Sequence, residues 1–160
     1  MTLSTVERVV ALQRVPLFAG VPGRTLVPLA RAAREVDVAP GQVVIVEAAV
    51  EDHLFVVVRG RLRVHRGDVT LTELGPGTTV GELAALVPEP RVASVTALEP
   101  ATLLRIDKPL LDELLADRPA LSSGVIAALV AMVRERAGRA QAGPDRQPEP
   151  GPPAQDRAAR

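Results

Sequence analysis

The chain of 160 residues contains no cysteine, no tryptophan and no tyrosine, and its aromatic side chains are limited to Phe18 and Phe55. The absence of cysteine excludes disulfides, thiol redox chemistry and cysteine-ligated iron–sulfur clusters. The scarcity of aromatic rings leaves almost no surface on which single-stranded bases could stack. Basic and acidic residues number 19 each, so the net charge is zero and no global charge attracts DNA or an anionic membrane.

Long apolar runs are also missing. No run approaches the roughly 20 residues that a membrane-spanning helix needs. The N-terminal stretch from Met1 to Arg14 carries Glu7 where a signal peptide would have an apolar core. We therefore expect no membrane span and a cytoplasmic location.

The apolar residues that are present predict helices at both ends and strands in the middle. A helical pattern over Thr5 to Arg14 and another after Pro22 and Gly23 precede the strands, and two helices, Leu110 to Ala116 and Ala120 to about Arg139, follow Asp107. Short β-branched runs spaced about ten residues apart predict a sandwich or barrel between them. These runs are Val36–Val38, Val43–Val46, Leu54–Val58, Leu62–His65, Val69–Leu74, Val92–Ala97 and Thr102–Ile106, with Gly67 and Asp68 forming a tight hairpin.

A glycine, a carboxylate and an arginine predict an anion site between two of these strands. Gly81 follows a predicted strand end at Thr78 to Val80 and lets the backbone approach a ligand before a short helical turn begins. The guanidinium of Arg91 can hold two phosphate oxygens, and it stays protonated at any physiological pH. Glu82 would be repelled by the same phosphate, so we expect it to accept a hydrogen bond from a neighbouring hydroxyl, such as a ribose 2′-OH. The alternative is a surface ion pair between Glu82 and Arg91, which would contribute little.

The segments around this site resemble the cyclic nucleotide-binding domains of bacterial catabolite-activator-type regulators, kinase regulatory subunits and some channels. The cassette Gly81-Glu82-Leu83-Ala84 followed by Arg91-Val92-Ala93 is similar to that family's phosphate-binding motif. The resemblance extends over Leu12 to Arg136 and includes three further motifs, Val15-Pro16-Leu17-Phe18, Pro40-Gly41-Gln42 and Leu74-Gly75-Pro76-Gly77.

This resemblance implies a mainly β fold with flanking helices, a double-stranded β-helix of jelly-roll type. It implies a ligand site at Gly81, Glu82, Leu83, Ala84, Arg91, Val92 and Ala93, with a cyclic nucleotide as ligand and no prosthetic group. Val92 stands where a threonine in the family is associated with guanine selectivity, which favours cyclic AMP over cyclic GMP. The family's long C-terminal helix can cover the purine and pair with its twin, so we expect aliphatic base contacts from Val125, Leu129 or Met132 and a homodimer.

Two segments depart from the family pattern. Ala48, Ala49, Val50, Glu51 and Asp52 replace a turn that usually contains two glycines. We expect this turn to be reshaped, with a small effect on the ligand because the cassette lies elsewhere in the sequence. After the long helix only a Pro-rich tail remains, residues 143–160, which we expect to be disordered beside a domain spanning residues 1–142. No helix-turn-helix region is visible, so we expect no DNA binding and an unidentified effector protein as partner.

Two other classes of function stay open beside the nucleotide sensor. A cupin-like enzyme would need clustered histidines with a carboxylate, whereas His53 and His65 stand apart and are expected to face solvent on strands. A degenerate domain without nucleotide, acting as a protein-interaction module, is favoured by the missing turn glycines and opposed by Glu82 and Arg91. We expect a regulatory module and not an enzyme.

Overall fold

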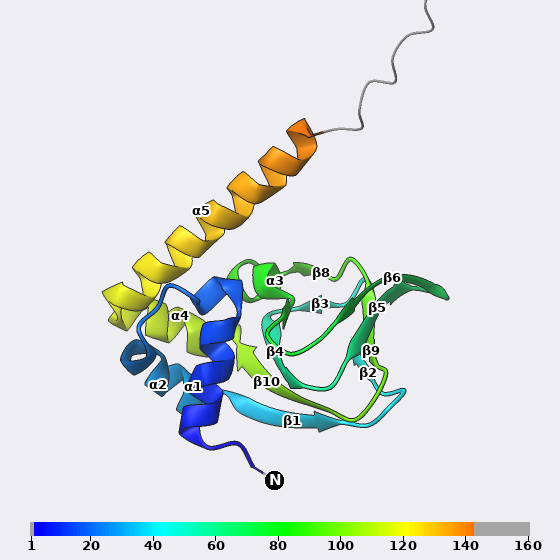
Figure 1. Cartoon of the computed structure of the whole chain (residues 1–160), viewed down its shortest axis with the longest axis horizontal. Coiled ribbons are helices and arrows are strands. Elements are labelled where there is room, and N and C mark those ends of the chain that lie inside the picture. The colour runs from blue at the N-terminus through cyan, green and yellow to red at the C-terminus, as the bar shows by residue number, and fades with distance from the viewer. Residues whose placement is uncertain (1, 143–160) are drawn as a thin grey trace, which may run out of the picture.

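Helices cover one side of a β-roll in the structure, a computed structural model that describes residues 2–142 (Figure 1). The helices are α1 (Thr5–Arg14), η1 (Pro16–Phe18), α2 (Gly23–Ala32), α3 (Glu82–Leu86), α4 (Lys108–Asp117) and α5 (Pro119–Gln141). The strands are β1 (Arg34–Val38), β2 (Val43–Ile45), β3 (Val50–Glu51), β4 (His53–Arg59), β5 (Leu62–Arg66), β6 (Val69–Leu74), β7 (Thr79–Val80), β8 (Glu89–Pro90), β9 (Ser94–Ala97) and β10 (Ala101–Asp107). The predicted mainly β fold with flanking helices is confirmed.

The β-roll consists of two antiparallel four-stranded sheets and one short strand pair. The sheets have the strand orders β1-β10-β4-β7 and β2-β9-β5-β6, and β3 pairs with β8. The hairpin predicted at Gly67 is confirmed, because Gly67 has a φ of +53° between β5 and β6. The sequence did not predict β3 and β8, which have two residues each.

Strand β4 separates two hydrophobic cores because its side chains alternate between its two faces. Leu54 and Val56 pack with the helices, whereas Phe55 and Val57 point into the roll. Strand β10 alternates in the same way, with Leu104 on the helical side and Leu103 inside the roll. The two central strands of one sheet therefore hold the helical layer and the β-roll together.

Helix α1 begins with a capping box. Ser4 accepts a hydrogen bond from the Glu7 backbone N–H, and the Glu7 carboxylate accepts one from the Ser4 backbone N–H at 2.8 Å. Hydrogen bonding of the Glu7 carboxylate to the backbone N–H and the side chain of Ser4, together with the charge of Arg59, lowers the pKa of Glu7. The helix predicted over Thr5 to Arg14 is thereby confirmed with the same bounds.

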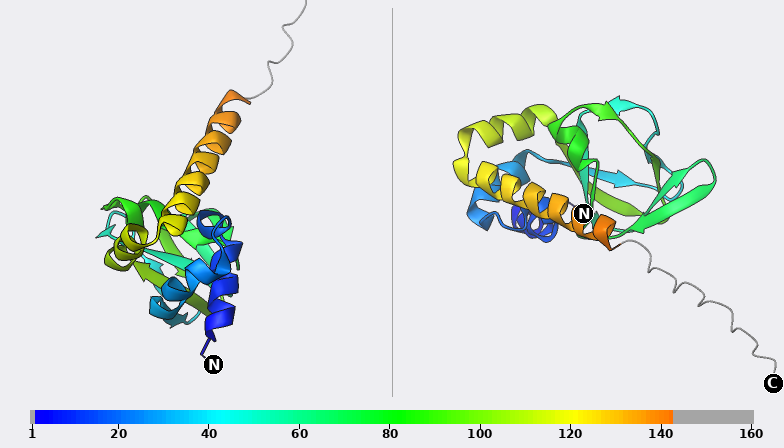
Figure 2. Two further views of the ribbon diagram at one scale, coloured as in Figure 1. Left: turned by 90° about the vertical axis from the view of Figure 1, so that its left-hand side faces the viewer. Right: turned by 90° about the horizontal axis from the view of Figure 1, so that it is seen from above.

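Helix α5 begins beside α4 and extends diagonally away from the rest of the molecule (Figures 1 and 2). Its buried residues, Leu121 and Val125, lie in its first two turns. Between residues 2 and 142 no single helix combines the length and apolar composition needed to cross a membrane. Helices α4 and α5 meet the criteria only as a pair, which is bent by 114°. The predicted tail, residues 143–160, lies outside the described residues.

Candidate functional site

Gly81 brings the backbone directly against the guanidinium of Arg91. It joins β7 to α3 with a φ of +79°, a conformation that favours glycine. A Cβ atom at this position would lie 1.9 Å from Arg91 Nη1. Any other residue at position 81 would therefore displace the arginine.

The side chain of Arg91 is buried, with 5% of it exposed. Its Nε donates to Glu51 Oε2 at 3.3 Å, and its Nη2 donates to the backbone oxygen of His53 at 2.5 Å. Nη1 is buried and has no hydrogen-bond partner within the described part of the chain. A buried donor without a partner costs about 1–3 kcal/mol, so this atom is suited to an incoming anion.

The sequence interpretation of the turn at Ala48 to Asp52 was wrong in two respects. This segment pairs with the cassette itself: the Ala48 backbone N–H donates to the oxygen of Arg91 at 2.8 Å, and the Arg91 N–H donates to Ala49 at 2.9 Å. Ala48 also keeps a positive φ of +67°, so the turn is not reshaped to avoid the left-handed region. The missing glycines therefore affect the segment that holds Arg91.

Glu82 lies at the start of α3 and does not pair with Arg91. Its carboxylate accepts a hydrogen bond from Thr79 Oγ1 at 3.3 Å. The ion-pair partner of Arg91 is Glu51, at 3.3 Å. The simple surface pair between Glu82 and Arg91 is therefore absent, and Glu82 keeps acceptor capacity toward the cavity.

Two adjoining cavities, of about 220 and 110 Å³, share Gly81, Arg91 and Val92. The larger is otherwise lined by Glu82, Ala84, Glu89, Pro90 and Arg136. The smaller lies over the apolar interior of the roll and is otherwise lined by Ile45, Val64, Val80, Ala93 and Val95. A cavity with charged side chains thus adjoins an apolar cavity, and Arg91, whose Nη1 has no partner in the described residues, lines both.

The cassette residues predicted from the sequence come together around these cavities. Gly81, Glu82, Ala84, Arg91 and Val92 line the larger cavity, and Ala93 lines the smaller one. Val92 is 72% exposed, and the backbone of Leu83 belongs to the single turn of α3.

The three α5 residues expected to contact the base do not line either cavity beside Arg91. Met132 lines a separate cavity together with Pro16. Val125 is 3% exposed and packs in the helical core, and Leu129 packs against the same core. Arg136, about two helical turns after Leu129 in α5, lines the larger cavity. Sequence reasoning missed Arg136 because it considered only the apolar residues of the helix.

His53 is buried, so its predicted exposure to solvent was wrong. Its ring stacks edge-on against Phe55, with the ring centroids 5.0 Å apart, and its Nε2 lies 3.5 Å from Glu51 Oε2. Burial lowers the pKa of His53, helped by the positive charges of Arg105 and Arg91, while Glu51 and Asp107 oppose the shift. Its imidazole is therefore neutral near pH 7.

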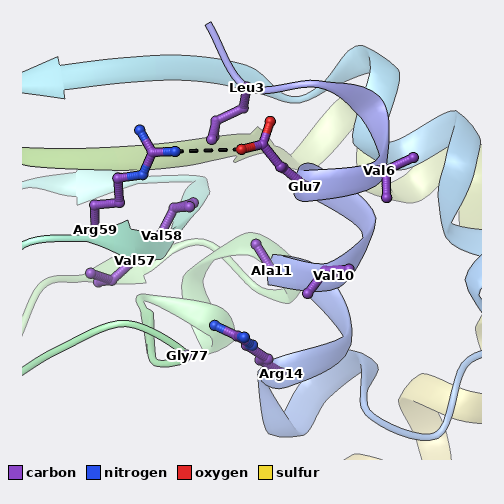
Figure 3. Close-up of a pocket in the computed structure, with 10 residues that line it drawn as sticks. All are labelled: Leu3, Val6, Glu7, Val10, Ala11, Arg14, Val57, Val58, Arg59 and Gly77. Atoms are coloured by element: carbon purple, nitrogen blue, oxygen red, sulfur yellow. Dashed lines mark hydrogen bonds and ion pairs between the residues drawn. The ribbon is translucent and has the colours of Figure 1, made fainter. Parts of the chain in front are cut away.

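Another cavity, of about 270 Å³, lies between α1 and the end of β4 (Figure 3). Its charged side chains, Glu7, Arg14 and Arg59, are all exposed, and Glu7 pairs with Arg59 at 3.5 Å. Charges in contact with water attract a ligand weakly. This cavity lacks the buried, unpartnered donor that marks the site at Arg91. Among residues 2–142 no group of three or more metal-ligating side chains occurs.

Comparison with known proteins agrees with the geometry. The sequence model of the cyclic nucleotide-binding domain matches residues 35–118, and the chain belongs to this family. A CRP-like cAMP-activated global transcriptional regulator of Mycobacterium tuberculosis is 28% identical over 128 residues, which cover 77% of this chain and 57% of the regulator. A cGMP-dependent protein kinase, egl-4 of Caenorhabditis briggsae, is 36% identical over 98 residues, 61% of this chain and 13% of the kinase.

A solved structure shows the same fold. The N-terminal domain of a transcriptional regulator from Streptomyces coelicolor A3(2) superposes with a TM-score of 0.76 at 30% identity, covering 81% of this chain and 94% of that domain. The chain matches 57% of the length of the Mycobacterium tuberculosis regulator and 13% of the length of the kinase, so it spans only part of each. What the comparisons show for this chain is a cyclic nucleotide-binding domain.

Proposed function

We propose that this chain is a cyclic nucleotide-binding regulatory module whose ligand is cyclic AMP, with cyclic GMP as the weaker alternative. The observation that carries the proposal is the buried, unpartnered Nη1 of Arg91 against Gly81, at the junction of a polar and an apolar cavity. One phosphate oxygen accepts from Nη1. The first-turn amides of α3 have no acceptors within the helix and support the same anion. This contact differs from the two-oxygen hold expected from the sequence, because Glu51 and His53 occupy the other donors.

Glu82 and Arg136 extend the proposed site to the rest of the nucleotide. The carboxylate of Glu82 accepts from the ribose 2′-OH, because it lines the same cavity as Arg91 without pairing with it. Arg136 reaches the cavity from α5 and faces the base. Val92 offers no side-chain hydroxyl to guanine, which supports cyclic AMP. The names of the two relatives include both nucleotides.

The contacts between α3 and α4 suggest how binding is relayed to a partner. The ammonium group of Lys108, the first residue of α4, donates to the backbone oxygen of Leu86 at the end of α3 at 3.0 Å. The Lys108 backbone N–H donates to Asp52, next to Glu51, at 2.8 Å. A ligand that moves α3 or the Glu51 segment therefore moves the start of α4, and α5 follows. Ligand shifts these helices only as far as it prefers one arrangement.

The proposed output is a regulatory interaction and not catalysis. We propose an unidentified effector protein as partner, a cytoplasmic location, no prosthetic group and a homodimer formed through α5. That the chain does not bind DNA stays a prediction, because it spans only part of its relatives.

The test of this function is isothermal titration with cyclic AMP and cyclic GMP. A hydrogen bond to a charged group contributes about 1.5–3 kcal/mol, so Arg91→Ala should weaken binding by about 10- to 100-fold. Arg91→Lys retains the charge without the planar donor group and should also bind weakly. Arg24→Ala, at an exposed position on α2, serves as the control. Equal binding by a folded Arg91→Ala variant would remove the phosphate assignment.

A ligand-free interaction module is the second candidate. It is favoured by one observation, the internal satisfaction of Arg91 Nε and Nη2 by Glu51 and His53. The same titration separates the two functions, because the absence of heat with both nucleotides at millimolar concentration would select the ligand-free module.

A further inference from the structure

Three carboxylates surround the arginine of the proposed site. Glu82 and Glu89 line the larger cavity, and Glu51 contacts Arg91 from β3. Two guanidinium groups, Arg91 and Arg136, oppose them. The site therefore contains more acidic than basic side chains before any ligand enters.

Glu51 is the carboxylate that acts most directly on Arg91. Its Oε2 lies 3.3 Å from Arg91 Nε, and 31% of its side chain is exposed against 5% for that of Arg91. The β3–β8 pair fixes its position, because Glu51 lies opposite Glu89 in this pair. Glu89 in turn precedes Arg91 by two residues. Oε2 also lies 3.5 Å from the ring of His53. That ring is neutral near pH 7, so among residues 2–142 Arg91 is the charged partner of Glu51.

We infer that Glu51 is a specificity-determining residue, which restricts the proposed nucleotide site to singly charged phosphate diesters and excludes doubly charged monoesters. The inference rests on the proposed function. A Coulomb energy scales with the charge of the ligand, so the carboxylate of Glu51 repels a dianion about twice as strongly as a monoanion at the same place. Glu51 takes Nε and the His53 backbone oxygen takes Nη2, so Nη1 is the Arg91 nitrogen left without a partner within residues 2–142, and a monoester needs more donors than this for its three terminal oxygens.

The test compares cyclic AMP with 5′-AMP on the native chain and on Glu51→Gln. At about pH 8 the monoester phosphate is a dianion, because its second pKa is about 6. Removing the charge of Glu51 should raise the affinity for both ligands. The gain in the logarithm of the affinity should be about twice as large for 5′-AMP, so that a gain of about 5-fold for cyclic AMP corresponds to about 25-fold for 5′-AMP. Glu47→Gln is the matched control, because Glu47 is exposed in the same segment, and it should change neither affinity more than about 2-fold.

Each result of these titrations decides the role of Glu51. Equal gains for both ligands, no gain for 5′-AMP, or loss of cyclic AMP binding in a folded Glu51→Gln protein would overturn it. Circular dichroism and thermal melting establish that the variant is folded. Failure of the native chain to bind any cyclic nucleotide would instead sink the proposed function. The role of Glu51 in selecting diesters would be overturned with it, whereas the three results above overturn that role alone.

Discussion

At the scale of one residue, Ala48 has a strained backbone conformation next to the proposed site. It has a φ of +67° although it carries a Cβ atom, and its N–H donates to the oxygen of Arg91. The left-handed region costs a residue with a side chain about 1–2 kcal/mol. Ala48 keeps this conformation because two backbone hydrogen bonds hold the turn against the cassette.

Replacing Ala48 by glycine should stabilise the protein. The free energy gained by relieving the strain exceeds the entropic cost of a more flexible unfolded chain. We therefore expect a gain of about 0.5–1 kcal/mol in the free energy of unfolding. Ala49→Gly, next to it, is the control and should lower stability, because Ala49 is not among the residues with a positive φ. Urea denaturation measures both changes. A destabilised Ala48→Gly variant would contradict the strain at this residue.

His53 makes the stability of the protein depend on pH. Its folded-state pKa is lowered from 6.5, mainly by burial, so the unfolded chain binds the proton more readily. The stabilisation is complete above about pH 7 and is lost as the pH falls through 6.5 toward the lowered pKa. Glu7, whose pKa is lowered from 4.5, acts in a separate, more acidic range.

We therefore expect the melting temperature to fall between about pH 7.5 and pH 5.5. His53→Gln should make this dependence shallower. An identical pH profile for the native chain and His53→Gln would rule out His53 as its source.

Helix α5 illustrates at the scale of an element how closely the helices are packed. Gly124 faces Val21, which lies three residues after the end of η1, and a Cβ on Gly124 would lie 2.5 Å from Val21 Cγ2. Gly138, farther along the same helix, has nothing within 4 Å of such a Cβ. The two glycines therefore have different roles in one helix.

We expect Gly124→Ala to lower the melting temperature. Overpacking costs about 1–3 kcal/mol and exceeds the gain of about 1 kcal/mol in helix propensity. Gly138→Ala has no such clash and should be neutral or slightly stabilising. Adding Val21→Ala to Gly124→Ala should restore part of the loss, because it removes the atom in contact. Thermal melts of the native chain, Gly138→Ala, Gly124→Ala, Val21→Ala and the double variant form the test, and additive effects of Gly124→Ala and Val21→Ala would contradict the contact.

At the scale of the whole molecule, α5 presents an apolar surface that no other described element covers. Ile126, Val130 and Val133 are spaced four and three residues apart, so they lie on one face of the helix, and they are 61%, 44% and 65% exposed. The helix extends beyond the body of the molecule, where a second copy can reach this face (Figure 2). This placement supports the proposed homodimer.

Sedimentation velocity tests the dimer. We expect the native chain to sediment as a dimer, and Ile126→Glu with Val133→Glu to sediment as a monomer, because two buried charges would face each other across the interface. Val69→Glu, 65% exposed on β6, should leave the dimer intact. A monomeric native chain at high concentration, with and without cyclic AMP, would remove the proposal.

Much of the fold was predictable because its signals are local. The pattern of apolar residues predicted α1, α2, α4 and α5, and β-branched runs broken by turn residues predicted seven of the strands to within a few residues. Strands β3 and β8 were not predictable, because two residues show no alternation. The pairing of these two strands is a long-range contact that brings Glu51 to Arg91 across 40 residues of sequence.

The sequence by itself determined the family, the order of the elements and the cassette from Gly81 to Ala93, since each depends on residues close together in the chain. Only the tertiary structure decided the partners of those residues. It paired Arg91 with Glu51 instead of Glu82, buried His53 and brought Arg136 to the cavity. The physical reason is that charge and burial depend on distances between segments, which the pairing of β3 with β8 and the direction of α5 set.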